Sequence, residues 1–191
     1  MRVPANGAFT NLTSHVTFSA WVRSAAGQAS NAAIWNNKAN GTSHSAACGT
    51  EITLDGSSAL DVRGASGTSR TVSVPTITPG AWHLVTVAYD GDTFAAYVDD
   101  NDGRRPLPTD KITPLAFSAT DALAMGQRVG WVNNDAPSTS CNWYGNLDEM
   151  RIGRKTESDD WVRACYDTVM DADFAVPARI RHTGGLVITV R

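Results

Sequence analysis

One stretch decides the class of fold: Trp82-His83-Leu84-Val85-Thr86-Val87-Ala88-Tyr89-Asp90-Gly91-Asp92-Thr93-Phe94-Ala95-Ala96-Tyr97-Val98-Asp99. Polar and apolar side chains alternate on both sides of Asp90-Gly91, as in two strands that each bury one face. An Asp-Gly pair between two such runs is a strong local signal for a tight turn. The stretch therefore predicts an antiparallel β-hairpin.

Short runs with the same period of two surround this hairpin. The segment 16–23 alternates, and further strands are expected at 33–36, 51–54, 59–63, 70–74, 123–126 and 147–152. One helix is expected, because the capping side chains of Thr156, Ser158 and Asp159 precede apolar residues spaced by about one turn. Short strands, frequent turns and a single late helix predict an all-β sandwich of two antiparallel sheets.

Length and charge restrict the possibilities further. The chain has 191 residues, with 16 basic against 19 acidic side chains. We expect one domain over 1–174 and a tail over 175–191, which is an edge strand or a linker to a following module. The net charge of −3 argues against a nucleic-acid partner, which would select a cationic face. The apolar runs are too short for insertion into a membrane, and no signal peptide is recognisable.

Three segments, taken in order, resemble the LamG-like branch of the concanavalin A-like lectin/glucanase superfamily. The first is Val16-Thr17-Phe18-Ser19-Ala20-Trp21-Val22. The second is the hairpin quoted above, and the third is Tyr144-Gly145-Asn146-Leu147-Asp148-Glu149-Met150-Arg151-Ile152. The order and spacing of the three segments carry the resemblance over residues 15–170. The resemblance implies a jelly-roll sandwich with one short C-terminal helix.

The resemblance implies less about function, since this fold hosts lectins, adhesion modules and hydrolases. The expected function is a non-catalytic carbohydrate-binding or adhesion module of a larger secreted or cell-surface protein with flanking domains. The alternative is a structural spacer or protein–protein interaction module without a sugar site. The location implied is extracellular, periplasmic or cell-surface, and the preference for Arg over Lys suggests a bacterial, GC-rich genome.

The sequence argues against an enzyme. Hydrolysis of glycosides needs two carboxyl groups a few ångströms apart. Glu51 and Asp55 are four residues apart, roughly 13 Å along a strand. Asp148 and Glu149 are adjacent, so on a regular strand they would point to opposite faces. A glycoside hydrolase is therefore the least favoured hypothesis.

A ligand site is expected in one polar, loop-like stretch. Sugar sites combine an aromatic face with amides or carboxylates that bond hydroxyl groups. The candidate residues are Trp131, Asn133, Asn134, Asp135, Asn142 and Trp143, with Trp35 near the same rim. The alternative for each tryptophan is that its ring caps the end of the core. Trp21, Trp82 and Trp161 are expected to be packing residues.

Asp148 is the candidate metal ligand. It shares a strand face with Met150 and Ile152 if the period of two holds, and a buried Asp must be paired, hydrogen-bonded or bound to metal. Related sandwiches often hold calcium, so one structural calcium ion is a possible cofactor. Cys48 and Cys141 lie in polar stretches, where a disulfide or two free thiols are equally compatible with the sequence. Cys165 is expected to pack on the apolar face of the helix.

Overall fold

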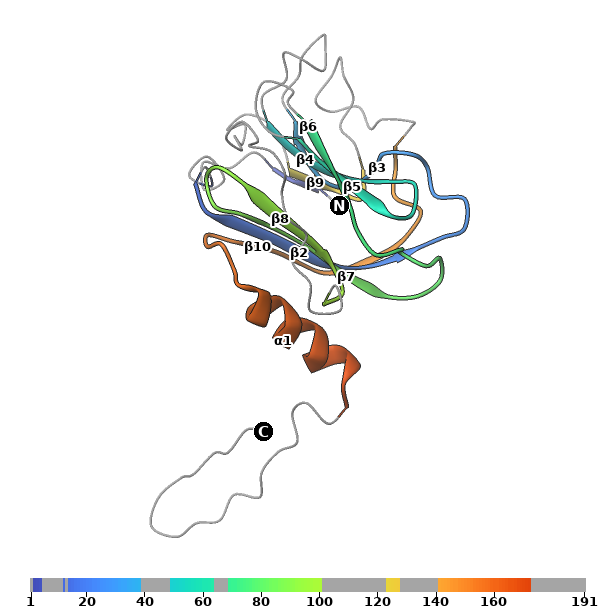
Figure 1. The fold of residues 1–191 in the computed structure, drawn as a ribbon. Coiled ribbons are helices and arrows are strands. Elements are labelled where there is room, and N and C mark those ends of the chain that lie inside the picture. Colours follow the sequence, from blue (N-terminus) through green and yellow to red (C-terminus); the bar gives the residue numbers. More distant parts are fainter. Residues whose placement is uncertain are drawn as a thin grey trace.

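The computed structural model describes residues 2–4, 12, 14–38, 49–63, 69–100, 123–127 and 141–172. Two antiparallel sheets stack face to face, with one helix beside them (Figure 1). The six-stranded sheet has the order β1-β9-β3-β4-β5-β6, and the four-stranded sheet has the order β10-β2-β7-β8. The elements are β1 (Arg2–Val3), β2 (Val16–Ser24), β3 (Ala32–Lys38), β4 (Gly49–Asp55), β5 (Ala59–Arg63), β6 (Ser69–Ser73), β7 (His83–Tyr89), β8 (Phe94–Val98), β9 (Leu123–Met125), β10 (Gly145–Gly153) and α1 (Asp159–Met170). The predicted all-β sandwich is confirmed.

The core lies between the two sheets. Along β2, the alternate residues Val16, Phe18, Ala20 and Val22 are fully buried and face the six-stranded sheet. The ring of Phe18 meets the ring of Trp35 edge-on, with 5.7 Å between their centroids. Burying a valine or phenylalanine side chain contributes roughly 1.5–3 kcal/mol to folding, so this alternation holds the layers together.

The hairpin of β7 and β8 forms as predicted, with residues 90–93 as the turn. The Asp90 carboxylate accepts hydrogen bonds from the N–H groups of Asp92 (3.0 Å) and Thr93 (2.7 Å). Partial burial acts to raise the pKa of Asp90, but these hydrogen bonds outweigh it, so the pKa lies below its ordinary value. The side chain therefore stays ionised and holds the turn closed.

Helix α1 covers the outer face of the four-stranded sheet. Ser158 caps it, since the Ser158 hydroxyl accepts from the Trp161 N–H at 3.3 Å. The indole of Trp21 stacks on Tyr166 of the helix at 6.0 Å. Val162 packs with Ala95 and Tyr97 of β8 in a second apolar cluster. The predicted packing role of Trp21 is thereby confirmed, and the outer face of this sheet is partly closed to solvent.

Two sheet pairs contain an irregularity that changes which face a side chain takes. The pairing of β3 with β4 shifts between Ala33 and Trp35, and the pairing of β10 with β2 shifts between Asp148 and Arg151. Such bulges insert an extra residue and reverse the alternation beyond it. Both shifts fall at residues that the sequence singled out.

Some predictions lie outside the described residues. These are the tail over 175–191 and Cys48, so the two alternatives for Cys48 and Cys141, a disulfide or two free thiols, are not covered. Cys165 is partly exposed on α1, and burial raises the pKa of its thiol despite the nearby Arg151 guanidinium.

Among the described residues, no helix has both the length and the apolarity to cross a membrane.

Candidate functional site

The first half of β10, an edge strand, carries the candidate site. Leu147 pairs with Val22 and Ile152 pairs with Phe18, and both partners face the core. Leu147 and Ile152 are five positions apart, so they share a face only because one extra residue is inserted between them. Glu149 lies in that insertion and has a φ of 45°, a left-handed backbone conformation that is costly for a non-glycine residue.

This bulge places Asp148 differently from the sequence expectation. Asp148 pairs with Trp21, so it lies on the helix-side face and is exposed, whereas Met150 packs against the core. The expectation that Asp148 is buried beside Met150 and Ile152 was wrong, because the extra residue reverses the alternation. Asp148 and Glu149 also do not diverge as expected: both line the same two depressions.

The first depression, which we call the Trp82 depression, lies at the C-terminal end of α1. It has a volume of about 260 Å³ and is lined by Trp21, Trp82, Asp148, Glu149, Val169 and Met170. Trp82 is 37% exposed, so the expectation that it is a packing residue was wrong. It directly precedes β7, after the turn at Pro79-Gly80, where the sheet no longer covers its ring. One exposed indole and two carboxylates therefore face one hollow.

The two carboxylates at this depression are held differently. Asp148 accepts a hydrogen bond from the backbone N–H of Glu149 at 2.8 Å. Glu149 accepts one from the guanidinium of Arg151. Both side chains are exposed, so the ion pair itself adds roughly 0–1 kcal/mol to stability. Its effect is to orient the Glu149 carboxylate.

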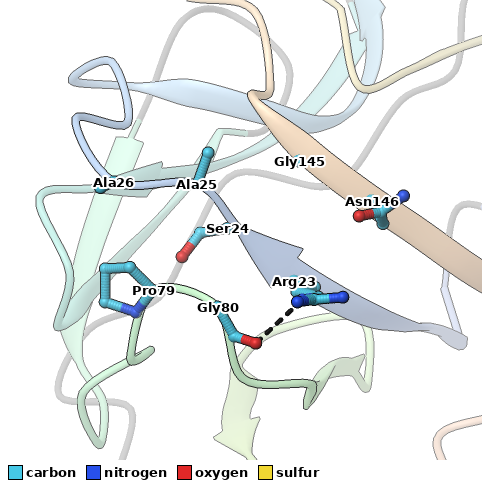
Figure 2. A pocket seen from close by; sticks show the side chains of 8 residues that line it. All are labelled: Arg23, Ser24, Ala25, Ala26, Pro79, Gly80, Gly145 and Asn146. Carbon is cyan, nitrogen blue, oxygen red and sulfur yellow. Dashed lines mark hydrogen bonds between the residues drawn. The ribbon is translucent and has the colours of Figure 1, made fainter.

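A second depression, the Arg23 groove, has a volume of about 410 Å³. Figure 2 shows its lining from three separate segments, which are residues 23–26, 79–80 and 145–146. The Arg23 Nε–H donates to the backbone carbonyl of Gly80 at 2.8 Å, which ties the end of β2 to the turn before Trp82. Asn146 stands opposite Arg23 in the strand register. Sequence reasoning missed this groove, because its parts are far apart in the chain.

A third depression, the Trp143 depression, has a volume of about 460 Å³ and lies around the edge of β10. It is lined by Met125, Gly126, Trp143, Gly145, Leu147, Asp148, Glu149 and Met150. Trp143 is only 8% exposed and belongs to the core cluster, so it forms the floor of this hollow. The structure thus brings together Trp143 and Asp148, which the sequence listed for different roles.

The other predicted ligand residues fall elsewhere. Trp35 is 1% exposed and packed in the core, where its ring is not available to a ligand. Asn142 is partly buried next to Trp143, and its Oδ1 has no hydrogen-bond donor within the described segments. Trp131, Asn133, Asn134 and Asp135 lie outside the described residues. These four stay predictions.

A separate polar cluster is buried on the outer face of the six-stranded sheet. The Arg63 Nε lies 2.7 Å from a carboxylate oxygen of Asp61 and 3.9 Å from one of Glu51. Asn36 donates to the other Glu51 oxygen at 3.2 Å. Glu51 is 0% and Asp61 4% exposed, so these acids are paired and closed to solvent. Such a network specifies the register of β3, β4 and β5.

The described residues do not by themselves complete a calcium site. Calcium takes six to eight oxygen ligands, with several from carboxylates. No group of three or more His, Cys, Asp or Glu side chains gathers anywhere in the described part of the chain. Near Asp148, the carboxylate of Glu149 is already paired with Arg151. The role of Asp148 as a metal ligand therefore stays a prediction.

Residues 1–163 match the family Laminin_G_3, described as the concanavalin A-like lectin/glucanases superfamily. The chain belongs to this superfamily. Membership agrees with the two stacked sheets and with the resemblance that the three motifs carry. No curated protein matches the chain significantly.

Solved structures show the same fold at low identity. A carbohydrate-binding module, CBM40, of the Ruminococcus gnavus IT-sialidase bound to sialyllactose has a TM-score of 0.60 and 11% identity, covering 81% of this chain and 83% of that chain. Domain 4 of the arabinanase AbnA from Geobacillus stearothermophilus, in complex with arabinotriose, has a TM-score of 0.58 and 17% identity, covering 86% and 71%. A SAP-like pentraxin from Limulus polyphemus has a TM-score of 0.57 and 12% identity, covering 94% and 81%. At these identities the similarity shows the fold, which is the same two-sheet sandwich.

Proposed function

We propose that this domain is a non-catalytic glycan-binding module and that the Trp82 depression is its binding site. The observation that carries the proposal is the bulge in β10, which directs two carboxylates into a hollow beside an exposed indole. An indole face packs against the C–H face of a sugar ring, while carboxylates accept hydrogen bonds from its hydroxyl groups. The complexes of two structural neighbours with arabinotriose and sialyllactose support a glycan as the ligand class.

The strained backbone at Glu149 supports the same assignment. A left-handed non-glycine residue costs roughly 1–3 kcal/mol and persists mostly at sites where it serves a function. Here the conformation turns Glu149 back toward the side of Asp148. A regular strand would have separated the two carboxylates.

Replacing Asp148 with Ala tests the proposal. We expect the affinity for the best-bound glycans of a broad array to fall about tenfold or more, since a charge-assisted hydrogen bond contributes about 1.5–3 kcal/mol. Because Asp148 is exposed, the melting temperature should hardly change. The control is Asp160→Ala, an exposed acid at the start of α1 that lines none of the three depressions.

The outcomes separate the alternatives. Retained binding in the Asp148→Ala variant would exclude the Trp82 depression as the binding site. It would favour the candidate residues within 131–135 instead. Absence of binding by the native domain across the array would favour the spacer or protein-interaction module. Release of reducing sugar from a bound glycan would identify a hydrolase.

We also propose that one structural calcium ion binds near Asp148. We further propose that the location of the protein is extracellular, periplasmic or at the cell surface. If calcium contributes to the fold, we expect EDTA to lower the midpoint of thermal unfolding and added calcium to restore it. The reason is that a ligand bound only to the folded state stabilises that state by mass action. An unchanged midpoint with EDTA would contradict the calcium proposal and leave the glycan proposal intact.

A further inference from the structure

We propose that the Trp82 depression and the Arg23 groove form one continuous binding groove, and that its ligand is an oligosaccharide of at least two linked units. This inference rests on the proposed function and specifies its ligand class. The Trp82 depression would take one sugar unit and the Arg23 groove the next.

The strand register places the two hollows next to each other on one face. Asp148 pairs with Trp21, and Asn146 pairs with Arg23. Residues two positions apart on a strand point to the same face and are separated by about 7 Å. Trp21 and Asp148 of the Trp82 depression therefore each have a neighbour on the same strand face in the Arg23 groove, and these neighbours are Arg23 and Asn146.

The turn before β7 also runs from one hollow to the other. Trp82 lines the first hollow and Gly80, two positions earlier, lines the second. The hydrogen bond from Arg23 to the Gly80 carbonyl fixes this turn against the end of β2 (Figure 2). Both hollows thus have walls from the same three parts of the chain: β2, β10 and the turn before β7.

The chemistry changes along the groove in a way that suits a polar chain. The Trp82 depression offers the exposed indole of Trp82, two carboxylates and the apolar side chains of Val169 and Met170. The Arg23 groove offers a guanidinium, the Asn146 amide and backbone from small residues, without an aromatic ring. One end can stack a sugar ring, whereas the other can only hydrogen-bond hydroxyl groups.

The experiment measures affinity against chain length by calorimetry, with arabino-, cello- and galacto-oligosaccharides of one to four units as probes. For the series that binds, we expect affinity to rise about tenfold from one unit to two, because the second unit gains its own contacts. Arg23→Ala should remove this gain, so that one unit and two units bind the variant with affinities within about twofold of each other. Trp82→Ala should weaken binding at every chain length.

Matched variants keep the result interpretable. Asn146→Ala should act like Arg23→Ala, which guards against a folding defect in either variant. Arg163→Ala is the control, since Arg163 is an exposed arginine on α1 whose side chain is 64% exposed and lines none of the hollows. Equal affinities for one, two and three units would overturn the extended groove while sustaining the glycan proposal. No binding of any series, together with an empty array, would overturn both.

Discussion

Replacing Trp35 with Ala is expected to lower the free energy of unfolding by about 3–5 kcal/mol, the cost typical of deleting a large buried aromatic side chain. Trp35 is 1% exposed and stands between the sheets, against Phe18 of β2 and opposite Ile52 of β4. Its indole N–H has no acceptor within the described segments, so the loss is one of packing. Chemical denaturation followed by fluorescence and circular dichroism measures the effect.

Trp82→Ala is the matched control for this prediction. Both variants delete the same side chain, but Trp82 is 37% exposed and lies at the surface. Its free energy of unfolding should fall by about 0.5 kcal/mol or somewhat more, while glycan binding weakens at every chain length. Equal destabilisation by the two variants would contradict the assignment of Trp35 to the core and of Trp82 to the binding site.

Gly145→Ala is expected to destabilise the domain by about 3 kcal/mol or more, through strained backbone and a steric clash together. Gly145 begins β10 with a φ of 133°, which L side chains rarely adopt. A Cβ there would stand 2.0 Å from the backbone carbonyl oxygen of Arg23. Because that obstacle is backbone, β10 would have to move away from β2, and the melting temperature should fall sharply.

Gly56→Ala separates strain from clash. Gly56 has a φ of 65°, and a Cβ there meets nothing within 4 Å. We expect a loss of only about 1 kcal/mol, because the left-handed backbone is the sole cost. If Gly145→Ala were no worse than Gly56→Ala, the close approach of β10 to Arg23 would be refuted. The affected contact also forms a wall of the Arg23 groove, so binding should weaken in the surviving folded fraction.

The strands and turns could be predicted because their causes are local. Alternation over Val16–Arg23 and over the hairpin places every second side chain in the core, and Asp90-Gly91 closes the turn by its own hydrogen bonds. The helix was equally predictable, since Ser158 caps it from within its own turn. The packing role of Trp21 is confirmed because helix α1, which follows eight further strands in the chain, covers its ring.

The candidate site was predicted only in part. Trp143 was chosen from its residue type in a polar stretch and Asp148 from its expected strand face, and the structure brings both to one depression. The sequence predicted Trp35 at the rim of the ligand site and Trp82 as a packing residue. In the structure Trp35 is buried in the core and Trp82 is exposed. Arg23, Gly80 and Asn146 could not be grouped, because nothing in their separate segments indicates that β10 pairs with β2.

The amino-acid sequence by itself determined the class of fold, the described strands other than β1, the hairpin turn and the helix. The reason is that propensity, alternation and capping act over a few neighbouring residues. Only the tertiary structure decided which face Trp35, Asp148 and Glu149 take. The reason is that one inserted residue in β3 and one in β10 reverse the alternation, and a bulge is chosen by how two strands fit against the same core. The binding groove depends on that choice, because it exists only where three distant segments meet.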